Sequence, residues 1–265
     1  MKMSSVKLLK EGVIQRVFKK TNKIFRSNSA TMDDFDWQLY HNHYQAEMEE
    51  VEKVHTQILS SGDYSFSDGA LSLQGNVLPL HPNYKLLYET ILQLNPRSIL
   101  ELGCGGGDHL HNIGLLLEGV KLYGMDISNG QLAFLRKRHP NSNASINQYD
   151  CTLPFPSTFP QVDVAYTQAV IMHIQTGNGH MIALSNLFRV ATKQVVLMEN
   201  WRKHDFMEDI KKLHALKVIP WEETYFYYRD SEEYKRPHLM IVSSVPLQQY
   251  KQLTDFAILC DGVGK

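Results

Sequence analysis

The sequence has few cysteines, no long apolar run and almost no net charge. Its three cysteines are far apart, so they fit neither a disulfide framework nor a structural zinc site, and we expect a reducing, cytoplasmic location. No apolar run approaches the roughly 18 residues of a membrane span. The formal net charge of −1 gives no bulk attraction to nucleic acid, which we do not expect as a partner. The 43% of hydrophobic residues excludes global disorder.

The small net charge hides a basic N-terminal segment. Residues 1–30 contain eight Lys and Arg against one acid, Glu11. Apolar residues recur there at helical spacing, so residues 1–26 could form a basic amphipathic helix that lies on an anionic membrane surface. Two alternatives stay open: a solvated tail, or a segment that docks on a second subunit of a homo-oligomer.

A helix and a hairpin are predicted to follow the tail. Aromatic and apolar residues from Trp37 to Ile58 fall on one helical face, which we expect to face the core, and Ser61–Asp63 should end the helix. Residues 64–76 alternate as two strands around an Asp68-Gly69 turn. We therefore divide the chain into a basic tail (1–30), a helix-plus-hairpin cap (31–80) and a main domain (81–265).

The main domain alternates between strand and helix patterns. Strands are expected near residues 98–102, 120–126, 144–149, 162–167, 194–199, 224–228 and 239–243, with amphipathic helices between most of them. This alternation is typical of an α/β domain with a mainly parallel, doubly wound sheet and helices on both faces.

A glycine-rich loop, Gly103 to Gly107, joins the first of these strands to a helix that Asp108 can cap. Asp126 ends the second strand about 20 residues later, where an acid can accept hydrogen bonds from ribose hydroxyls. The pattern predicts a nucleoside-containing ligand. A dinucleotide is disfavoured because Asp108 occupies the sixth position of the glycine fingerprint and would repel a pyrophosphate. Acids on both sides of the loop, Glu101 and Asp108, suit a ligand that carries an ammonium group.

Residues 101–107, read as Glu-Leu-Gly-Cys-Gly-Gly-Gly, resemble the first motif of class I S-adenosylmethionine-dependent methyltransferases. Asp126 is similar to the ribose-binding acid of these enzymes, and residues 150–155 resemble their adenine-side motif. The segment 166–173 and the run 199–201 further resemble bacterial sugar O-methyltransferases of the glucosylglycerate methyltransferase kind. The resemblance implies a Rossmann-like, seven-stranded sheet whose last strand is antiparallel.

The resemblance also implies the cofactor-binding residues. The glycine loop would hold the methionine part, Asp126 the ribose, and Ile127 and Asp150 the adenine. The full set that it implies is Glu101, Gly103, Cys104, Gly105, Asp126, Ile127, Asp150, Cys151 and Gln168.

The acceptor is expected to be a hydroxyl. The motif N/D-P-P-Y/F, used on exocyclic or amide nitrogens, is absent after the fourth strand. An alcohol profits from a general base, and we assign His173 as the catalytic base, with His180 and His204 as rivals. Glu199 is the second catalytic candidate: it could bind a sugar hydroxyl, orient a histidine or ligate Mg²⁺. The metal ligands themselves stay unknown. Substrate contacts are expected from Tyr166, Asn200, Trp201, His204 and Tyr227.

The sequence thus predicts an S-adenosylmethionine-dependent O-methyltransferase that acts on a sugar or a sugar-containing metabolite. Phenolic or polyketide hydroxyls are alternative acceptors. An NAD(P)-binding oxidoreductase or epimerase is the alternative from another class, and a methyltransferase-like domain used only for assembly is a third hypothesis.

Overall fold

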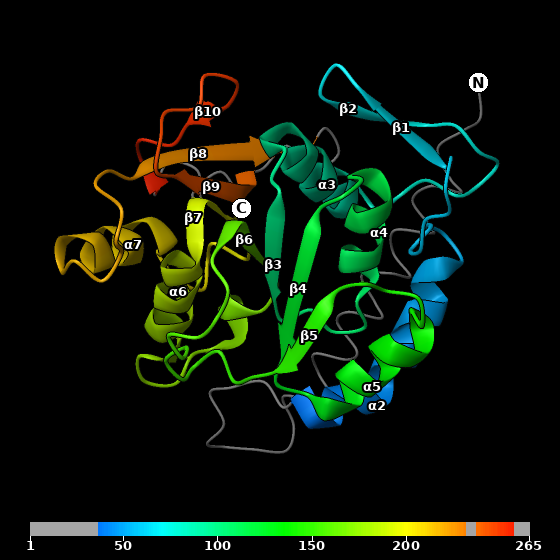
Figure 1. Cartoon of the computed structure of the whole chain (residues 1–265), viewed down its shortest axis with the longest axis horizontal. Coiled ribbons are helices and arrows are strands. Elements are labelled where there is room, and N and C mark those ends of the chain that lie inside the picture. Colours follow the sequence, from blue (N-terminus) through cyan, green and yellow to red (C-terminus); the bar gives the residue numbers. More distant parts are fainter. Residues whose placement is uncertain (1–36, 232–236, 257–265) are drawn as a thin grey trace, which may run out of the picture. The chain divides into compact units, whose positions relative to one another are not determined.

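The computed structural model describes residues 37–231 and 237–256 (Figure 1). The basic tail and its predicted membrane contact through residues 1–26 lie outside the described residues. No described helix is both long and apolar enough to cross a membrane.

The described chain alternates between strands and helices, as predicted. The helices are α2 (Trp37–Glu52), α3 (Pro82–Leu94), α4 (Asp108–Leu116), α5 (Asn129–Arg138), the 3₁₀ helix η1 (Ile171–His173), α6 (Gly179–Val190) and α7 (Phe206–Ala215). The strands are β1 (Tyr64–Ser67), β2 (Ala70–Leu73), β3 (Ser98–Leu102), β4 (Lys121–Asp126), β5 (Ser145–Gln148), β6 (Val162–Gln168), β7 (Ala191–Met198), β8 (Tyr225–Asp230), β9 (Pro237–Ser243) and β10 (Lys251–Gln252).

The large sheet has the order β10-β8-β9-β7-β6-β3-β4-β5 (Figure 1). Strands β3 to β7 pair in parallel, and β9 lies between β7 and β8, antiparallel to both. The seventh strand of the sheet, β9, is antiparallel, as predicted. The described sheet has eight strands rather than the expected seven, because the two-residue strand β10, which was not predicted, pairs antiparallel with β8.

The sheet separates two hydrophobic cores because its strands alternate their side chains between two faces. On β3, Leu100 and Leu102 pack in the core that α6 and α7 cover, whereas Ile99 packs in the core shared with α3, α4 and α5. Helices thus cover both faces, as a doubly wound parallel sheet requires.

Helix ends follow local chemistry at several positions. Pro82 occupies the first turn of α3, and Asn95 ends that helix in the left-handed region. The Ser128 hydroxyl accepts a hydrogen bond from the Gln131 N–H at the start of α5. The predicted cap at Asp108 is wrong: Gly107 is the N-cap of α4 and offers no side-chain hydrogen bond.

Helix α2 ends earlier than the apolar spacing predicted, at Glu52 rather than near Ser61. Beyond it, the Thr56 N–H donates to the Pro79 carbonyl oxygen and the Leu59 N–H donates to Asn112 Oδ1. These hydrogen bonds come from residues far along the sequence, so a helical period could not indicate them. The hairpin β1–β2 is confirmed, with Asp68 and Gly69 both at positive φ, as a type I′ turn needs.

Two glycines with the same φ angle differ in how closely other side chains pack against them. Gly103 and Gly119 both have a φ of +76°. A Cβ atom on Gly103 would lie 2.3 Å from Val170 Cγ2, whereas a Cβ atom on Gly119 would have no neighbour within 4 Å.

We expect Gly119→Ala to lower the free energy of unfolding by about 1–2 kcal/mol through backbone conformation alone. Gly103→Ala should lose about 1–3 kcal/mol more, because the new methyl group overpacks the loop after β6. Urea unfolding of both variants measures the difference. Equal losses would contradict the close packing of Val170 on Gly103.

Candidate active site

The glycine loop leaves the carboxyl end of β3 and turns toward β4. The N–H groups of Gly103 and Cys104 donate to the Met125 carbonyl oxygen at 2.7 and 2.9 Å. Gly105 has a φ of +49°, and Gly107 begins α4. The loop therefore lies at the switch point between β3 and β6, where α/β sheets bind ligands.

Asp126, at the end of β4, binds the glycine loop. Its Oδ2 accepts the Gly105 N–H at 2.9 Å, and its Oδ1 accepts the Ser128 N–H at 2.8 Å. Burial raises the pKa of this carboxyl group, and the two N–H donors partly oppose that rise. Each carboxylate oxygen has a further lone pair, so Asp126 can still accept a ribose hydroxyl.

Glu101 is fully buried beneath the loop. Burial raises its pKa to about 8, and the neighbouring Tyr166 hydroxyl partly offsets the rise. Tyr166 is close enough to lower the pKa of Glu101, but neither Glu101 Oε2 nor the Tyr166 hydroxyl has a partner with hydrogen-bond distance and angles among the described residues. A buried carboxyl oxygen without a partner is costly, and a bound ammonium group would satisfy it.

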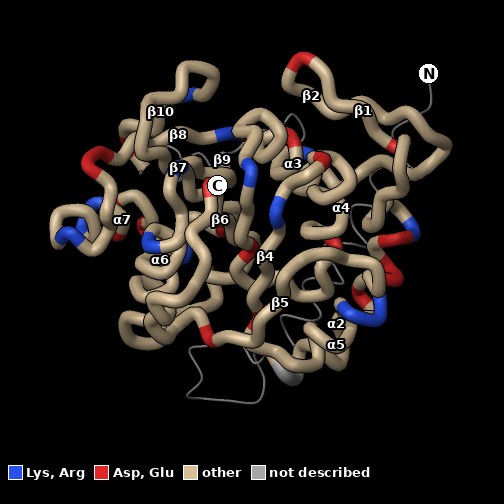
Figure 2. The backbone as a smooth tube through the Cα atoms, viewed as in Figure 1, with Lys and Arg blue, Asp and Glu red and all other residues tan. Residues whose placement is uncertain are grey.

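Asp108, the second acid beside the loop, does not face a ligand. Its Oδ1 lies 2.7 Å from both Arg138 Nε and His139 Nε2. These partners keep its pKa below the usual range despite burial. Arg138 also pairs with Glu52, and Figure 2 shows acidic and basic residues together where α2 and α5 meet. The expectation that Asp108 attracts an ammonium group or repels a pyrophosphate is therefore wrong.

The expected adenine residues follow β4 and β5. The Ile127 side chain is 41% exposed, as an apolar platform for a planar ring would be. Asp150 Oδ1 accepts both the Thr152 N–H and its hydroxyl. Burial raises the pKa of the Cys151 thiol to about 12, and the Cys151 carbonyl oxygen accepts from Asn186. Cys151 is thus a structural residue with no thiolate chemistry at neutral pH.

Helix α2 covers the glycine loop. A Cβ atom on Gly106 would lie 3.1 Å from Tyr44, and one on Gly130 would lie 2.4 Å from His41. Tyr44 also packs edge-on against Phe134 of α5. The aromatic face of α2 thus lies against the site. Sequence reasoning missed His41 and Tyr44, although the aromatic spacing of α2 had already marked the face on which Tyr44 lies.

Glu199 binds the loop that follows β6. Its carboxylate accepts hydrogen bonds from the Thr167 hydroxyl and from the N–H groups of Val170, Ile171 and Met172, at 3.0–3.3 Å. Burial raises its pKa to about 7, and these donors oppose the rise. Because this carboxylate is buried and holds four donors, Glu199 is placed to position the loop rather than to bind an acceptor or a metal.

His173 ends that loop. Its ring packs edge-on against Trp37, with ring centroids 5.4 Å apart. Burial and then the charge of Lys203 lower its pKa to about 4, so the imidazole is neutral at pH 7. Gln168, at the end of β6, lies beside His109, whose pKa burial lowers to about 4.

Three expected substrate residues are buried in the core. Tyr166 has no exposed surface, and the Tyr227 hydroxyl accepts the Leu247 N–H. Trp201 stacks on Phe256 at 5.1 Å. Such packing leaves these three side chains unable to contact an acceptor without rearrangement of the core.

The other two expected substrate residues follow β7. Asn200 is exposed and accepts the Arg202 N–H. His204 stacks on His180, and burial lowers its pKa.

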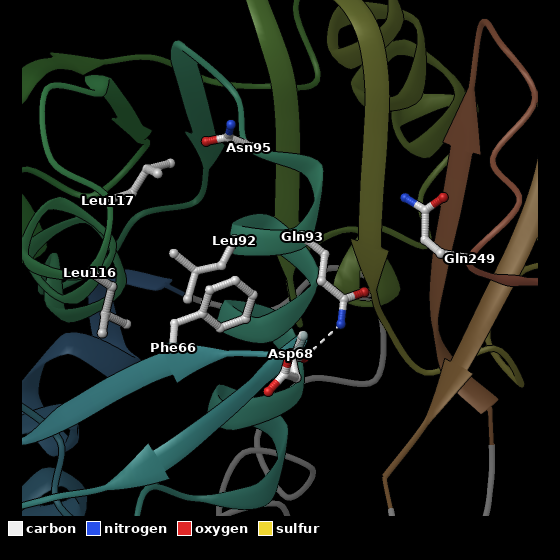
Figure 3. A pocket seen from close by; sticks show the side chains of 9 residues that line it. Phe66, Asp68, Leu92, Gln93, Asn95, Leu116, Leu117 and Gln249 are labelled. Carbon is white, nitrogen blue, oxygen red and sulfur yellow. Dashed lines mark hydrogen bonds between the residues drawn. The ribbon is translucent and has the colours of Figure 1, made fainter.

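A cavity of about 620 Å³ lies elsewhere (Figure 3). It is lined by Phe66, Asp68, Gly69, Leu92, Gln93, Asn95, Leu116, Leu117 and Gln249. Asn95 precedes β3, whereas the glycine loop follows β3. The cavity is therefore at the opposite end of that strand from the site, and we assign it no part in the chemistry.

Residues 100–198, from β3 to the end of β7, match the family model of a methyltransferase domain. The protein is an S-adenosylmethionine-dependent methyltransferase. This finding favours the methyltransferase over the alternative NAD(P)-dependent oxidoreductase or epimerase.

Several solved structures match this chain at low identity. A bacterial methyltransferase domain, CtHen1, is 17% identical over 62% of this chain and 98% of its own, with a TM-score of 0.48. Magnesium protoporphyrin IX methyltransferase from Synechocystis PCC 6803 is 17% identical over 61% of this chain and 79% of its own, with a TM-score of 0.45. The amino pentose methyltransferase CalS10 from Micromonospora echinaspora is 14% identical over 64% and 60%, with a TM-score of 0.42. A search of the curated proteins found no match.

The residues of this methyltransferase fit the cofactor. The unpartnered oxygen of Glu101 suits its ammonium group, and Asp126 suits its ribose. Gly103 and Gly105 give the loop the positive φ angles that bring its backbone close to a ligand. When bound, S-adenosylmethionine supplies the electrophilic methyl group.

The raised pKa of Glu101 predicts a pH-dependent stability. The folded state without cofactor binds more protons than the unfolded state between about pH 4.5 and 8, so the free energy of unfolding falls as the pH rises through that window. Glu101→Gln cannot ionise, so its Tm relative to wild type should increase from pH 5 to pH 9. Glu118→Gln, on the surface, is the control. A Tm difference that stays constant with pH would contradict a neutral Glu101.

Asp126 gives a binding test. We expect micromolar binding of S-adenosylmethionine and S-adenosylhomocysteine by calorimetry, and no binding of NAD(H). Asp126→Ala and Asp126→Asn should weaken cofactor binding at least about 10-fold, because one or more charge-assisted hydrogen bonds are lost. Circular dichroism checks that both variants fold. Unchanged affinity would remove Asp126 from the ribose site.

Proposed function

We propose that this methyltransferase acts on a hydroxyl oxygen of a small-molecule acceptor, a sugar or a sugar-containing metabolite, with His173 as the general base. The observation that carries the proposal is the position of His173. It ends the loop after β6, at the carboxyl edge of the sheet, and Glu199 fixes that loop through hydrogen bonds to three of its backbone N–H groups.

The chemistry of the acceptor supports a base at this place. An alcohol becomes a better nucleophile when its proton is withdrawn during the reaction. The imidazole of His173 is neutral throughout the physiological pH range, and a neutral imidazole is the form of histidine that accepts a proton. The residues after β6 are Ala169 and Val170, which offer none of the aromatic and proline groups of the nitrogen-methylating motif.

Two further side chains near this edge are those of Asn200 and of Trp37 in α2. Asn200 follows Glu199 directly, and its amide can donate to an acceptor hydroxyl while Oδ1 holds the Arg202 N–H. Trp37, against which His173 packs, offers an apolar ring beside the base. The resemblance to the glucosylglycerate methyltransferase kind stays a prediction.

His173→Ala should lower kcat by about 10²–10⁴-fold with any hydroxyl acceptor, because proton transfer by a positioned side chain contributes that much. S-adenosylhomocysteine production is measured over a panel of sugars, glycosides, phenols and amines, with saturating S-adenosylmethionine. The affinity for the cofactor should stay within about twofold in the variant.

His43→Ala, at an exposed histidine of α2, is the matched control and should leave kcat unchanged. Turnover with phenols alone would support the alternative acceptor class. Turnover with amines alone, or an undiminished kcat for His173→Ala, would overturn the proposal.

A further inference from the structure

A cluster of two histidines and one aspartate lies apart from the cofactor residues. His180 is in the first turn of α6, His204 follows β7, and Asp209 is on α7. One ligand atom from each of the three side chains lies within 4.8 Å of the others. Three separate segments of the chain thus bring two imidazoles and one carboxylate to one point.

The three side chains do not satisfy one another. His180 Nε2 is 3.5 Å from Asp209 Oδ2, which is long for a hydrogen bond. The two imidazole rings stack with centroids 4.3 Å apart and planes 11° apart. His180 Nδ1 and His204 Nε2 are buried and have no hydrogen-bond partner among the described residues. Unpartnered buried ring nitrogens of this kind are costly.

The open nitrogen of His204 is Nε2, which has no hydrogen-bond partner among the described residues. The backbone groups of Ile171 and Ile174 lie beside the same ring and partly oppose the lowering of its pKa by burial. A histidine that donates one ring N–H to a backbone carbonyl and directs the other nitrogen to an ion is the usual arrangement of a metal ligand.

We propose that His180, His204 and Asp209 bind one divalent transition-metal ion. Two imidazole nitrogens and one carboxylate oxygen suit Zn²⁺, Co²⁺, Mn²⁺ or Fe²⁺, whereas Mg²⁺ prefers oxygen ligands. The side chains of His180 and Asp209 are 17% and 15% exposed, so an ion can enter from solvent. Three protein ligands leave at least one coordination position for water or an acceptor oxygen.

Metal binding changes the stacked arrangement and fixes the neighbouring loop. The lone pair of a ring nitrogen lies in the plane of its ring, and the two planes are nearly parallel, so at least one ring turns when both bind the same ion. The ion then joins α6, α7 and the turn after β7. His204 lies beside the backbone of Ile171 and Ile174, on either side of His173.

The test uses the untagged, full-length protein after treatment with a chelator. Co²⁺ is added while visible absorption is recorded, and Zn²⁺ is then titrated by calorimetry and in competition. We expect one ion per chain, ligand-field bands of bound Co²⁺ that Zn²⁺ abolishes, and a Zn²⁺ Kd at or below the micromolar range. Mg²⁺ should neither bind at comparable concentration nor displace Co²⁺.

Variants assign the ion to the cluster. His204→Ala and Asp209→Asn should weaken Zn²⁺ binding by about 100-fold or more, since even changes outside the ligand set cost 10–100-fold. The matched controls are His43→Ala and Glu208→Gln, which alter an exposed histidine and the exposed acid beside Asp209. Both controls should keep the wild-type affinity.

Three results would overturn the site: no Zn²⁺ or Co²⁺ binding, wild-type affinity in Asp209→Asn, or the same loss in Glu208→Gln. Tighter binding of Mg²⁺ than of Zn²⁺ would overturn the class of metal. If His204→Ala does not fold by circular dichroism, the nearly isosteric Asp209→Asn decides the outcome alone.

Discussion

One buried carboxyl group links the two halves of the site. Glu199 follows β7 directly and accepts hydrogen bonds from the Val170, Ile171 and Met172 N–H groups of the loop after β6. The same loop places Val170 against Gly103 and carries His173 at its end. The cofactor loop and the proposed base are therefore held by the same set of contacts. Moving Glu199 would disturb both at once.

Asp108 and Glu101 lie on either side of the glycine loop in the sequence, but their electrostatic surroundings in the structure differ. Asp108 pairs with the Arg138 guanidinium, hydrogen-bonds His139 and stabilises the packing of α4 on α5. Glu101 is left buried, with a pKa of about 8 and an unpartnered oxygen. Burial of an unpaired acid costs free energy unless a ligand compensates for it. Burial of Glu101 lowers the stability of the folded protein without ligand, and such a local loss of stability is expected at a binding site.

Helix α2 shows what the spacing of apolar residues can predict and what it cannot. The spacing of its aromatic residues predicted one buried face, and the face exists. Periodicity gives no information on the partner of this face, which is the glycine loop and α5. The early end of α2 has the same origin, because hydrogen bonds from residues 79 and 112 hold the chain that follows it.

The sequence alone determined the alternating elements, the mainly parallel sheet, the glycine loop and Asp126, since each depends on local periodicity or on spacing within one strand–loop–helix unit. Only the tertiary structure decided the roles of side chains that depend on neighbours far along the chain. It buried Tyr166 in the core, turned Glu199 into a loop anchor, and brought His180, His204 and Asp209 together. Strand ends predict which residues share an edge of the sheet, but the packing of helices on the two faces decides which side chains remain free to meet a ligand.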